Sequence, residues 1–210
     1  MISLFIDTSH SRLIVSIVDE TKMKLLSIYD EILKNDLSVK IFEVITDSMN
    51  HIGVFPDMID KIYISTGPGS FTGIRIGITI AKTYAWSLNK TIIPVSSLEV
   101  LASSSNSSII VPVIDARRDF VYAGIYDKDL NVLKEDSYIS TESLIKDIES
   151  KDYQVISDDE ISYFPIITKP EVDILKIIKK HKNDIGMNPH EVNPRYLKVT
   201  EAEAKLNKND

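Results

Sequence analysis

The two halves of the chain repeat each other at a fixed offset. The segment Phe5-Ile6-Asp7-Thr8-Ser9 matches Val113-Ile114-Asp115-Ala116-Arg117, an offset of 108 residues (115 minus 7), and the same offset continues without a gap as far as Asp127. Each copy reads as a strand, an acidic turn, a second strand and a second acidic turn. Two hairpins in register indicate a duplicated fold. We therefore expect residues 1–30 and 109–138 to form equivalent three-stranded meanders in two adjacent domains.

The length of the chain and one low-complexity segment locate these domains. A chain of 210 residues can form two small domains that each bury a core. The serine-rich segment at residues 103–108 has a composition typical of a domain boundary. We predict an α/β protein with an N-terminal domain at residues 1–106 and a smaller C-terminal domain at residues 107–210. Each domain would have a mixed sheet and flanking helices.

A glycine-rich stretch joins a predicted strand at residues 61–65 to a predicted helix at residues 70–88. Residues 67–69 (Gly-Pro-Gly) form a tight turn, and Ser70 or Thr72 can cap the helix. Backbone N–H groups at a helix N-terminus can bind an anion. However, no Gly-Lys-Ser/Thr follows these glycines, and their spacing is off register for the dinucleotide fingerprint. The stretch is therefore a weak candidate for a phosphate site.

Two predicted helices, at residues 31–52 and 70–88, carry more apolar surface than one core contact requires. Their apolar arcs are wider than the ~100° of a single core-facing stripe, and small residues recur at every fourth position of the second helix. This small-residue strip could fit the helix against its own sheet or admit a partner helix, and periodicity does not separate the two. Two such helices in succession favour a subunit interface. The predicted interface residues are Leu33, Leu37, Ile41, Val44, Ile45, Gly73, Gly77, Ala81 and Ala85.

The same surface predicts how the protein associates. An exposed apolar patch larger than a few hundred Å² rarely stays bare. We therefore expect a two-fold homodimer when the protein is alone, and a heterodimer that replaces it on the same surface.

Composition and charge exclude several classes of function. The net charge of -7 and the lack of a long basic run argue against autonomous nucleic-acid binding. The absence of cysteine excludes disulfides, thiol nucleophiles and thiolate metal sites. No segment approaches the ~20 consecutive apolar residues of a membrane-spanning helix, and the N-terminus lacks the pattern of a signal peptide. We expect a cytoplasmic protein with no membrane association.

Few residues suggest catalytic chemistry. Asp7 and Asp115 end the first strands of the two repeats, where they could hold Mg²⁺, position a water or cap their own turns. No second carboxylate at short spacing supports a metal site, which favours turn capping. The four histidines include no i, i+4 pair, and Ser70 lacks the Gly-x-Ser-x-Gly pattern of a nucleophile elbow. We predict no catalytic residue, no cofactor and no metal site.

Four motifs are shared with one known family. They are Gly67-Pro68-Gly69-Ser70-Phe71-Thr72-Gly73-Ile74-Arg75-Ile76-Gly77, Ser96-Ser97-Leu98-Glu99, Asp115-Ala116-Arg117-Arg118 and Pro194-Arg195-Tyr196-Leu197. With these motifs the chain closely resembles the TsaB (older name YeaZ) family, whose members are dimerisation subunits in bacterial tRNA threonylcarbamoyladenosine synthesis. The matches span nearly the whole chain, and the eleven-residue glycine stretch is highly specific.

This resemblance implies the duplicated fold of actin, hexokinase and heat-shock chaperones (the ASKHA fold), in agreement with the repeat. It also implies a non-catalytic subunit that pairs with a larger, metal-containing homologue, TsaD, and with the ATPase TsaE. TsaD transfers threonylcarbamoyl to adenosine 37 of tRNA, which would bind this chain only through the complex. Family members often have His-Ser-Glu where this chain has Leu37-Ser38-Val39. This difference puts in doubt any polar contact that residues 37–39 would make with the partner, but not the pairing with TsaD itself.

Two alternatives remain open. One is an independent nucleotide-dependent enzyme of the sugar-kinase-like or M22 glycoprotease-like type, against which the missing metal ligands and phosphate loop count. ATP turnover by the isolated chain that is lost on Asp7→Ala would support it. The other is direct tRNA binding by the isolated chain, which the acidic balance disfavours and a salt-sensitive gel shift would support.

Overall fold

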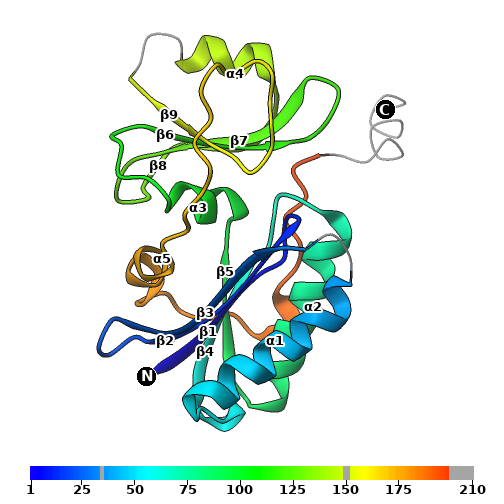
Figure 1. Ribbon diagram of the computed structural model, residues 1–210, viewed down its shortest axis with the longest axis vertical. Helices are drawn as coiled ribbons and strands as arrows, with labels where there is room; N and C mark the ends of the chain where they lie inside the picture. Colours follow the sequence, from blue (N-terminus) through cyan, green and yellow to red (C-terminus); the bar gives the residue numbers. More distant parts are fainter. Residues whose placement is uncertain (34–35, 149–151, 199–210) are drawn as a thin grey trace.

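The computed structural model describes residues 1–33, 36–148 and 152–198. Figure 1 shows two β-sheets, one above the other, with two short helices in the space between them. Within the described ranges, no helix is both long enough and apolar enough to cross a membrane.

The first sheet has five strands in the order β3-β2-β1-β4-β5. β1 pairs antiparallel with β2 and parallel with β4, and β4 pairs parallel with β5. Helix α2 (Phe71–Ser87) is the crossover that joins β4 to β5, and α1 (Leu37–Ile52) lies beside it on the same face of the sheet (Figure 1). The strands are β1 (Ile2–Asp7), β2 (Arg12–Asp19), β3 (Lys24–Ile32), β4 (Ile59–Ser65) and β5 (Thr91–Val95).

The second sheet has four strands in the order β8-β7-β6-β9. β6 pairs antiparallel with β7 and parallel with β9, as β1 does with β2 and β4. Helix α4 (Thr141–Ile148) packs on this sheet. The strands are β6 (Ile110–Asp115), β7 (Phe120–Tyr126), β8 (Val132–Ser140) and β9 (Gln154–Ile156).

The two meanders are equivalent strand by strand. The offset of 108 residues carries the bounds of β1 onto those of β6 (2 to 110 and 7 to 115) and the bounds of β3 onto those of β8 (24 to 132 and 32 to 140). Each sheet then adds one parallel strand beside its first strand. The predicted duplicated α/β fold with two mixed sheets, the ASKHA arrangement, is confirmed.

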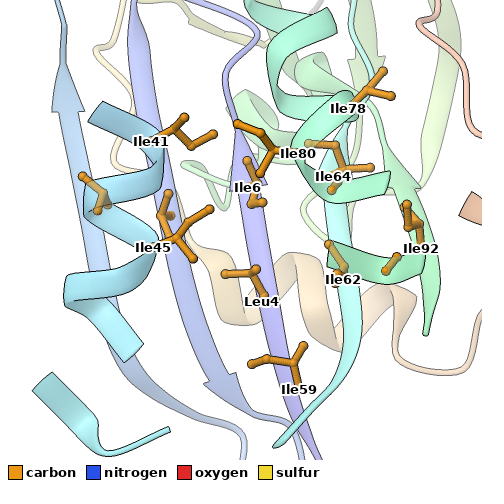
Figure 2. Close-up of a cluster of buried hydrophobic side chains, with 14 of the residues drawn as sticks. Leu4, Ile6, Ile41, Ile45, Ile59, Ile62, Ile64, Ile78, Ile80 and Ile92 are labelled. Atoms are coloured by element: carbon orange, nitrogen blue, oxygen red, sulfur yellow. The ribbon is translucent and has the colours of Figure 1, made fainter. Parts of the chain in front are cut away.

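Three hydrophobic cores hold these layers together. The first lies between the first sheet and helices α1 and α2, where Ile41 and Ile45 of α1 pack towards Leu4 and Ile6 of β1 (Figure 2). The second lies between the two sheets and includes α3 (Ser97–Ala102) and α5 (Ile174–His181). The third lies between the second sheet and α4. Because the second core contains side chains from both sheets, the two repeats share buried apolar surface.

Two helices begin later than their sequence pattern predicts. β3 continues to Ile32, because residues 30–32 still pair with β2, and α1 therefore starts at Leu37 and not at residue 31. Pro170 is of the residue type typical of a first helical turn and predicts a helix from residue 170. Helix α5 starts instead at Ile174, because the Asp173 side chain caps it by accepting a hydrogen bond from the backbone N–H of Lys176. The short 3₁₀ helices are Pro56–Met58 and Pro189–Glu191.

The serine-rich segment is packed, whereas its composition suggests a linker. Ser103 and Ser105 are buried, and the hydroxyls of Ser105 and Ser107 donate hydrogen bonds to Gln154 Oε1 at 2.5 and 2.8 Å. Since Gln154 belongs to β9, these bonds tie the segment to the second sheet. The domain boundary at residues 106 and 107 stays a prediction.

Candidate partner surface

The glycine-rich loop between β4 and α2 packs directly on the turn between β1 and β2. The backbone N–H of Ser70 donates a hydrogen bond to Ser9 O at 2.6 Å. Gly69 has φ +152°, and a Cβ atom there would lie 2.1 Å from Ser9 O. No other residue type fits so close to a backbone oxygen. Ser70 caps α2 by accepting a hydrogen bond from the N–H of Gly73. The loop is therefore explained by packing within the chain.

The small-residue strip of α2 faces the protein's own sheet. A Cβ atom on Gly73 would lie 2.1 Å from Thr8 O, and one on Gly77 would lie 2.2 Å from Thr8 Oγ1. Ala81 and Ala85 are completely buried in the first core. Periodicity left open whether the strip packs on the protein's own sheet or on a partner helix. In the structure it packs on the protein's own sheet.

The predicted interface residues of α1 also turn inwards. Ile41, Val44 and Ile45 are buried in the first core, and Leu33 and Leu37 are partly buried against it. Seven of the nine predicted interface residues are therefore covered within the chain, because the first sheet needs an apolar cover on this face and α1 and α2 provide it, whereas the assignment of Leu33 and Leu37 stays a prediction. An interface on these two helices stays a prediction, and only the opposite sides of the helices can supply its contacts.

The outer sides of α1 and α2 expose large apolar side chains. On α1, Val39 and Phe42 are 68% and 52% exposed and lie three residues apart on one face. On α2, Phe71 and Trp86 at its two ends are 54% and 67% exposed. We call Val39, Phe42 and Trp86 the outer apolar residues. Sequence periodicity could not identify them, because it reports an apolar face without saying which neighbour covers it.

A cleft of 610 Å³ separates the first turns of the two repeats. Ser9 and His10 line it on one side, and Asp115 and Arg117 line it on the other. Asp7 Oδ1 accepts a hydrogen bond from the N–H of Ser9 at 2.7 Å, and Asp115 Oδ1 accepts one from the N–H of Arg117 at 2.8 Å. The turn-capping interpretation of both aspartates is thus confirmed, and the two caps are themselves related by the offset of 108 (7 to 115 and 9 to 117).

Arg12 links β2 to the segment after β9 beside this cleft. Its guanidinium donates two hydrogen bonds to Asp158, at 3.1 and 2.9 Å, and one to Asp30 at 2.6 Å. Burial alone would lower the pKa of Arg12, but the two carboxylates outweigh burial and raise it. Arg12 is therefore a permanent cation whose charge is already balanced. Among the described residues, no group of three or more histidines, aspartates or glutamates is arranged to hold a metal ion.

Two clusters of buried polar residues, around Glu99 and Asp136, could not be identified from the sequence. Glu99 is buried and binds His181 Nε2 at 2.7 Å and Lys180 Nζ at 3.0 Å. Asp136, whose side chain is 2% exposed, accepts hydrogen bonds from three groups on distant parts of the chain. No local pattern marks either residue, because every partner lies more than nine positions away in sequence.

Comparison with known proteins adds the family. A family model described as "TsaD: tRNA N6-adenosine threonylcarbamoyltransferase" matches residues 27–201. The chain is 39% identical over 137 residues to the tRNA threonylcarbamoyladenosine biosynthesis protein TsaB of Bacillus subtilis, which covers 64% of this chain and 59% of that protein. It is 32% identical over 149 residues to the protein of the same name from Buchnera aphidicola subsp. Schizaphis graminum, with 69% of each covered.

A solved structure agrees with the fold. "YeaZ from Pseudomonas aeruginosa" superposes with a TM-score of 0.79 over 93% of this chain and 100% of that one, at 19% identity. At this level of identity the likeness concerns the fold alone. Family membership therefore rests on the sequence match to the family model and to the two curated relatives. Both relatives are TsaB proteins, the family that the shared motifs predict. The chain belongs to the TsaB (YeaZ) family.

Proposed function

We propose that this chain is a non-catalytic subunit that holds and activates a TsaD-like transferase in the formation of N6-threonylcarbamoyladenosine at position 37 of tRNA. A TsaE-like ATPase would join the same complex. The observation that carries the proposal is the outer apolar surface of α1 and α2, which the protein's own fold leaves uncovered. A second copy of the chain would cover this surface in the free protein.

The composition of this surface suits a protein partner. Tryptophan and phenylalanine are enriched at the energetic centres of interfaces, where they fill pockets on the partner. Trp86 is 67% exposed and Phe42 is 52% exposed, so more than half of the surface of each residue faces solvent and could be buried by a partner. Neighbouring helices also offer a ridge-and-groove surface on which a second pair of helices can pack. Scattered exposed apolar residues are ordinary, but several on adjacent helices are typical of a docking face.

The cleft gives less support to the enzymatic alternative. Asp7 and Asp115 already cap their own turns, and Asp158 is paired with Arg12. A nucleotide-dependent enzyme would need carboxylates that remain available for a metal ion or for an attacking group. The chemistry that acts on tRNA is therefore assigned to the partner.

Co-purification with the transferase tests the proposal. We expect Phe42→Glu and Trp86→Glu each to abolish capture of a TsaD-like transferase by the tagged chain, because a buried charge without a partner costs several kcal/mol. Modified nucleoside formed by the reconstituted system should fall in parallel. Both side chains are exposed in the monomer, so the melting temperature should stay within about 1 °C of the parent.

Ile166→Glu is the matched control. Ile166 is 79% exposed, but it lies in the second domain beyond β9, so its replacement should leave capture intact. Capture that survives both helix variants would contradict the proposed surface. ATP hydrolysis by the isolated chain that is lost on Asp7→Ala would instead favour the enzymatic alternative.

A further inference from the structure

An exposed cluster of rings and one guanidinium stands at the N-terminal end of α2. The rings of Phe71 and Tyr196 stack with centroids 5.3 Å apart, and the Arg75 guanidinium lies 3.8 Å from the Phe71 centroid. Arg75 Nε donates a hydrogen bond to the Tyr196 hydroxyl at 2.8 Å. Its two terminal amino groups make no hydrogen bond within the described part of the chain. Arg75 is thus held in one orientation with two donors available to an oxyanion.

A second cluster continues from the first. Lys198 lies two positions after Tyr196, and its ammonium is 5.1 Å from the ring centroid of Tyr138. Tyr138 stacks on Phe120 at 4.7 Å and tilts against Tyr122 at 5.7 Å. Since Phe120 and Tyr122 belong to β7 and Tyr138 to β8, the second sheet presents these rings as one ladder. One ring of each cluster, Phe71 of the first and Tyr122 of the ladder, lines the cleft between the two repeats.

Basic and acidic side chains both lie near this cleft. Arg117 and Arg118 are exposed, and neither guanidinium forms a hydrogen bond or an ion pair with any residue that the structure describes. Among the acidic groups that the structure describes here, Asp158 is paired with Arg12, whereas Asp115 and Asp159 accept only backbone N–H groups and keep their negative charges. The charges of Arg117 and Arg118 are therefore offset by those of Asp115 and Asp159, and the cations left for an RNA are those of the two clusters, Arg75 and Lys198.

We propose that these two clusters form a binding strip for unpaired nucleotides of the substrate RNA. The strip consists of Phe71, Arg75, Tyr196, Lys198 and Tyr138. It combines flat rings with cations, and such surfaces bind single strands by stacking on the bases and neutralising the phosphates. The inference rests on the proposed function, which supplies an RNA to the complex. Because the rest of the chain repels RNA, the strip acts only once the transferase holds the same RNA.

Binding of a labelled RNA to the assembled complex tests the strip. The probe is a fluorescent stem–loop RNA with an unpaired loop, and a duplex of the same composition serves for comparison. We expect Tyr196→Ala to weaken stem–loop binding about tenfold or more, since one base stacked on an aromatic ring contributes that much. Lys198→Gln should weaken binding less and should reduce the slope of log affinity against log salt by about 0.7, the value for one phosphate contact on a single strand. Binding of the duplex should change little.

Two exposed residues on other surfaces provide matched controls. Phe55 is 65% exposed and precedes β4, at the opposite end of that strand from the glycine loop, and the Lys22 side chain is 76% exposed in the turn after β2. Phe55→Ala and Lys22→Gln should leave RNA binding and its salt slope unchanged. Transferase capture by every variant is measured alongside.

Each outcome decides the assignment. Weakened RNA binding with intact capture supports the strip. Unchanged RNA binding in both strip variants overturns it and leaves the proposed scaffold function standing. Loss of capture in Tyr196→Ala or Lys198→Gln would assign these residues to the protein partner and also overturn the RNA assignment. Failure of the parent chain to capture the transferase would refute the scaffold function itself.

Discussion

Thr8 sets how closely α2 can approach the first sheet. Its hydroxyl donates a hydrogen bond to Gly73 O at 2.8 Å, while its own carbonyl and hydroxyl oxygens occupy the space where side chains at Gly73 and Gly77 would lie. At Gly73 the obstacle is a backbone oxygen, and at Gly77 it is a buried hydroxyl that is held in place by its bond to Gly73 O, so neither can easily move aside. Glycine at these two positions is therefore required by packing, although glycine is a poor helix former that costs about 1 kcal/mol relative to alanine.

Ala81→Leu tests this packing at the scale of one residue. The spacing of small residues on α2 predicts Ala81 at a partner surface, but the residue is completely buried in the first core. We expect the substitution to lower the free energy of unfolding by about 1–3 kcal/mol, because overpacking forces neighbouring side chains and backbone apart. Urea denaturation measures the change. Thr79→Leu is the control on the exposed side of the same helix, and an equal loss there would contradict the packing explanation.

At the scale of the element, α3 and α5 are joined by one buried ionic cluster. Both ring nitrogens of His181 contact carboxylates: Nε2 lies 2.7 Å from Glu99 and Nδ1 lies 2.6 Å from Asp184. Burial by itself lowers the pKa of His181, but the hydrogen bond and charge of Glu99 and the hydrogen bond of Asp184 outweigh burial and raise it above 6.5. Lys180, which also binds Glu99, opposes this rise with its positive charge.

This cluster predicts a pH dependence of stability. A histidine whose pKa is raised by folding binds more protons in the native state, so its contribution is fully present below pH 6.5 and is lost as the pH rises through the folded pKa. We expect the free energy of unfolding to fall over that interval in the parent. His181→Gln should flatten the dependence, whereas His51→Gln, on the exposed face of α1, should not. Urea denaturation across the interval measures it, and equal slopes in parent and His181→Gln would exclude this cause.

At the scale of the whole molecule, Asp136 ties three separate parts of the chain together. Its carboxylate accepts hydrogen bonds from Tyr126 of β7 at 2.5 Å, from Ser96 before α3 at 2.6 Å and from Arg195 of the C-terminal segment at 2.8 Å. Burial, followed by the nearby Asp136 charge, raises the pKa of Tyr126, so that phenol remains a donor. Arg195 also donates its backbone N–H to Thr66 O beside the glycine loop, so the network connects both sheets.

Replacing Asp136 should loosen this connection. Asp136→Ala removes the shared acceptor and leaves the buried Tyr126 hydroxyl without a partner, which typically costs about 3 kcal/mol or more when a charged member of a buried network is removed. Glu135→Ala is a matched control, since the neighbouring Glu135 side chain is 81% exposed and should change stability by less than about 0.5 kcal/mol. Thermal unfolding followed by circular dichroism compares them, and equal effects would contradict the network.

Local features of the sequence determined the duplicated meanders, the glycine turn and the capping roles of Asp7 and Asp115. Each depends on neighbours within a few positions, because strand alternation, positive-φ turns and Asx turns are local properties. The tertiary structure decided which sides of α1 and α2 face the sheet, and with that the identity of the outer apolar residues. It also decided that Glu99 binds α5 and that Tyr196 stacks on Phe71. An apolar helix face in the sequence shows only that some other surface packs on it. Which surface packs there depends on contacts between residues far apart in the chain.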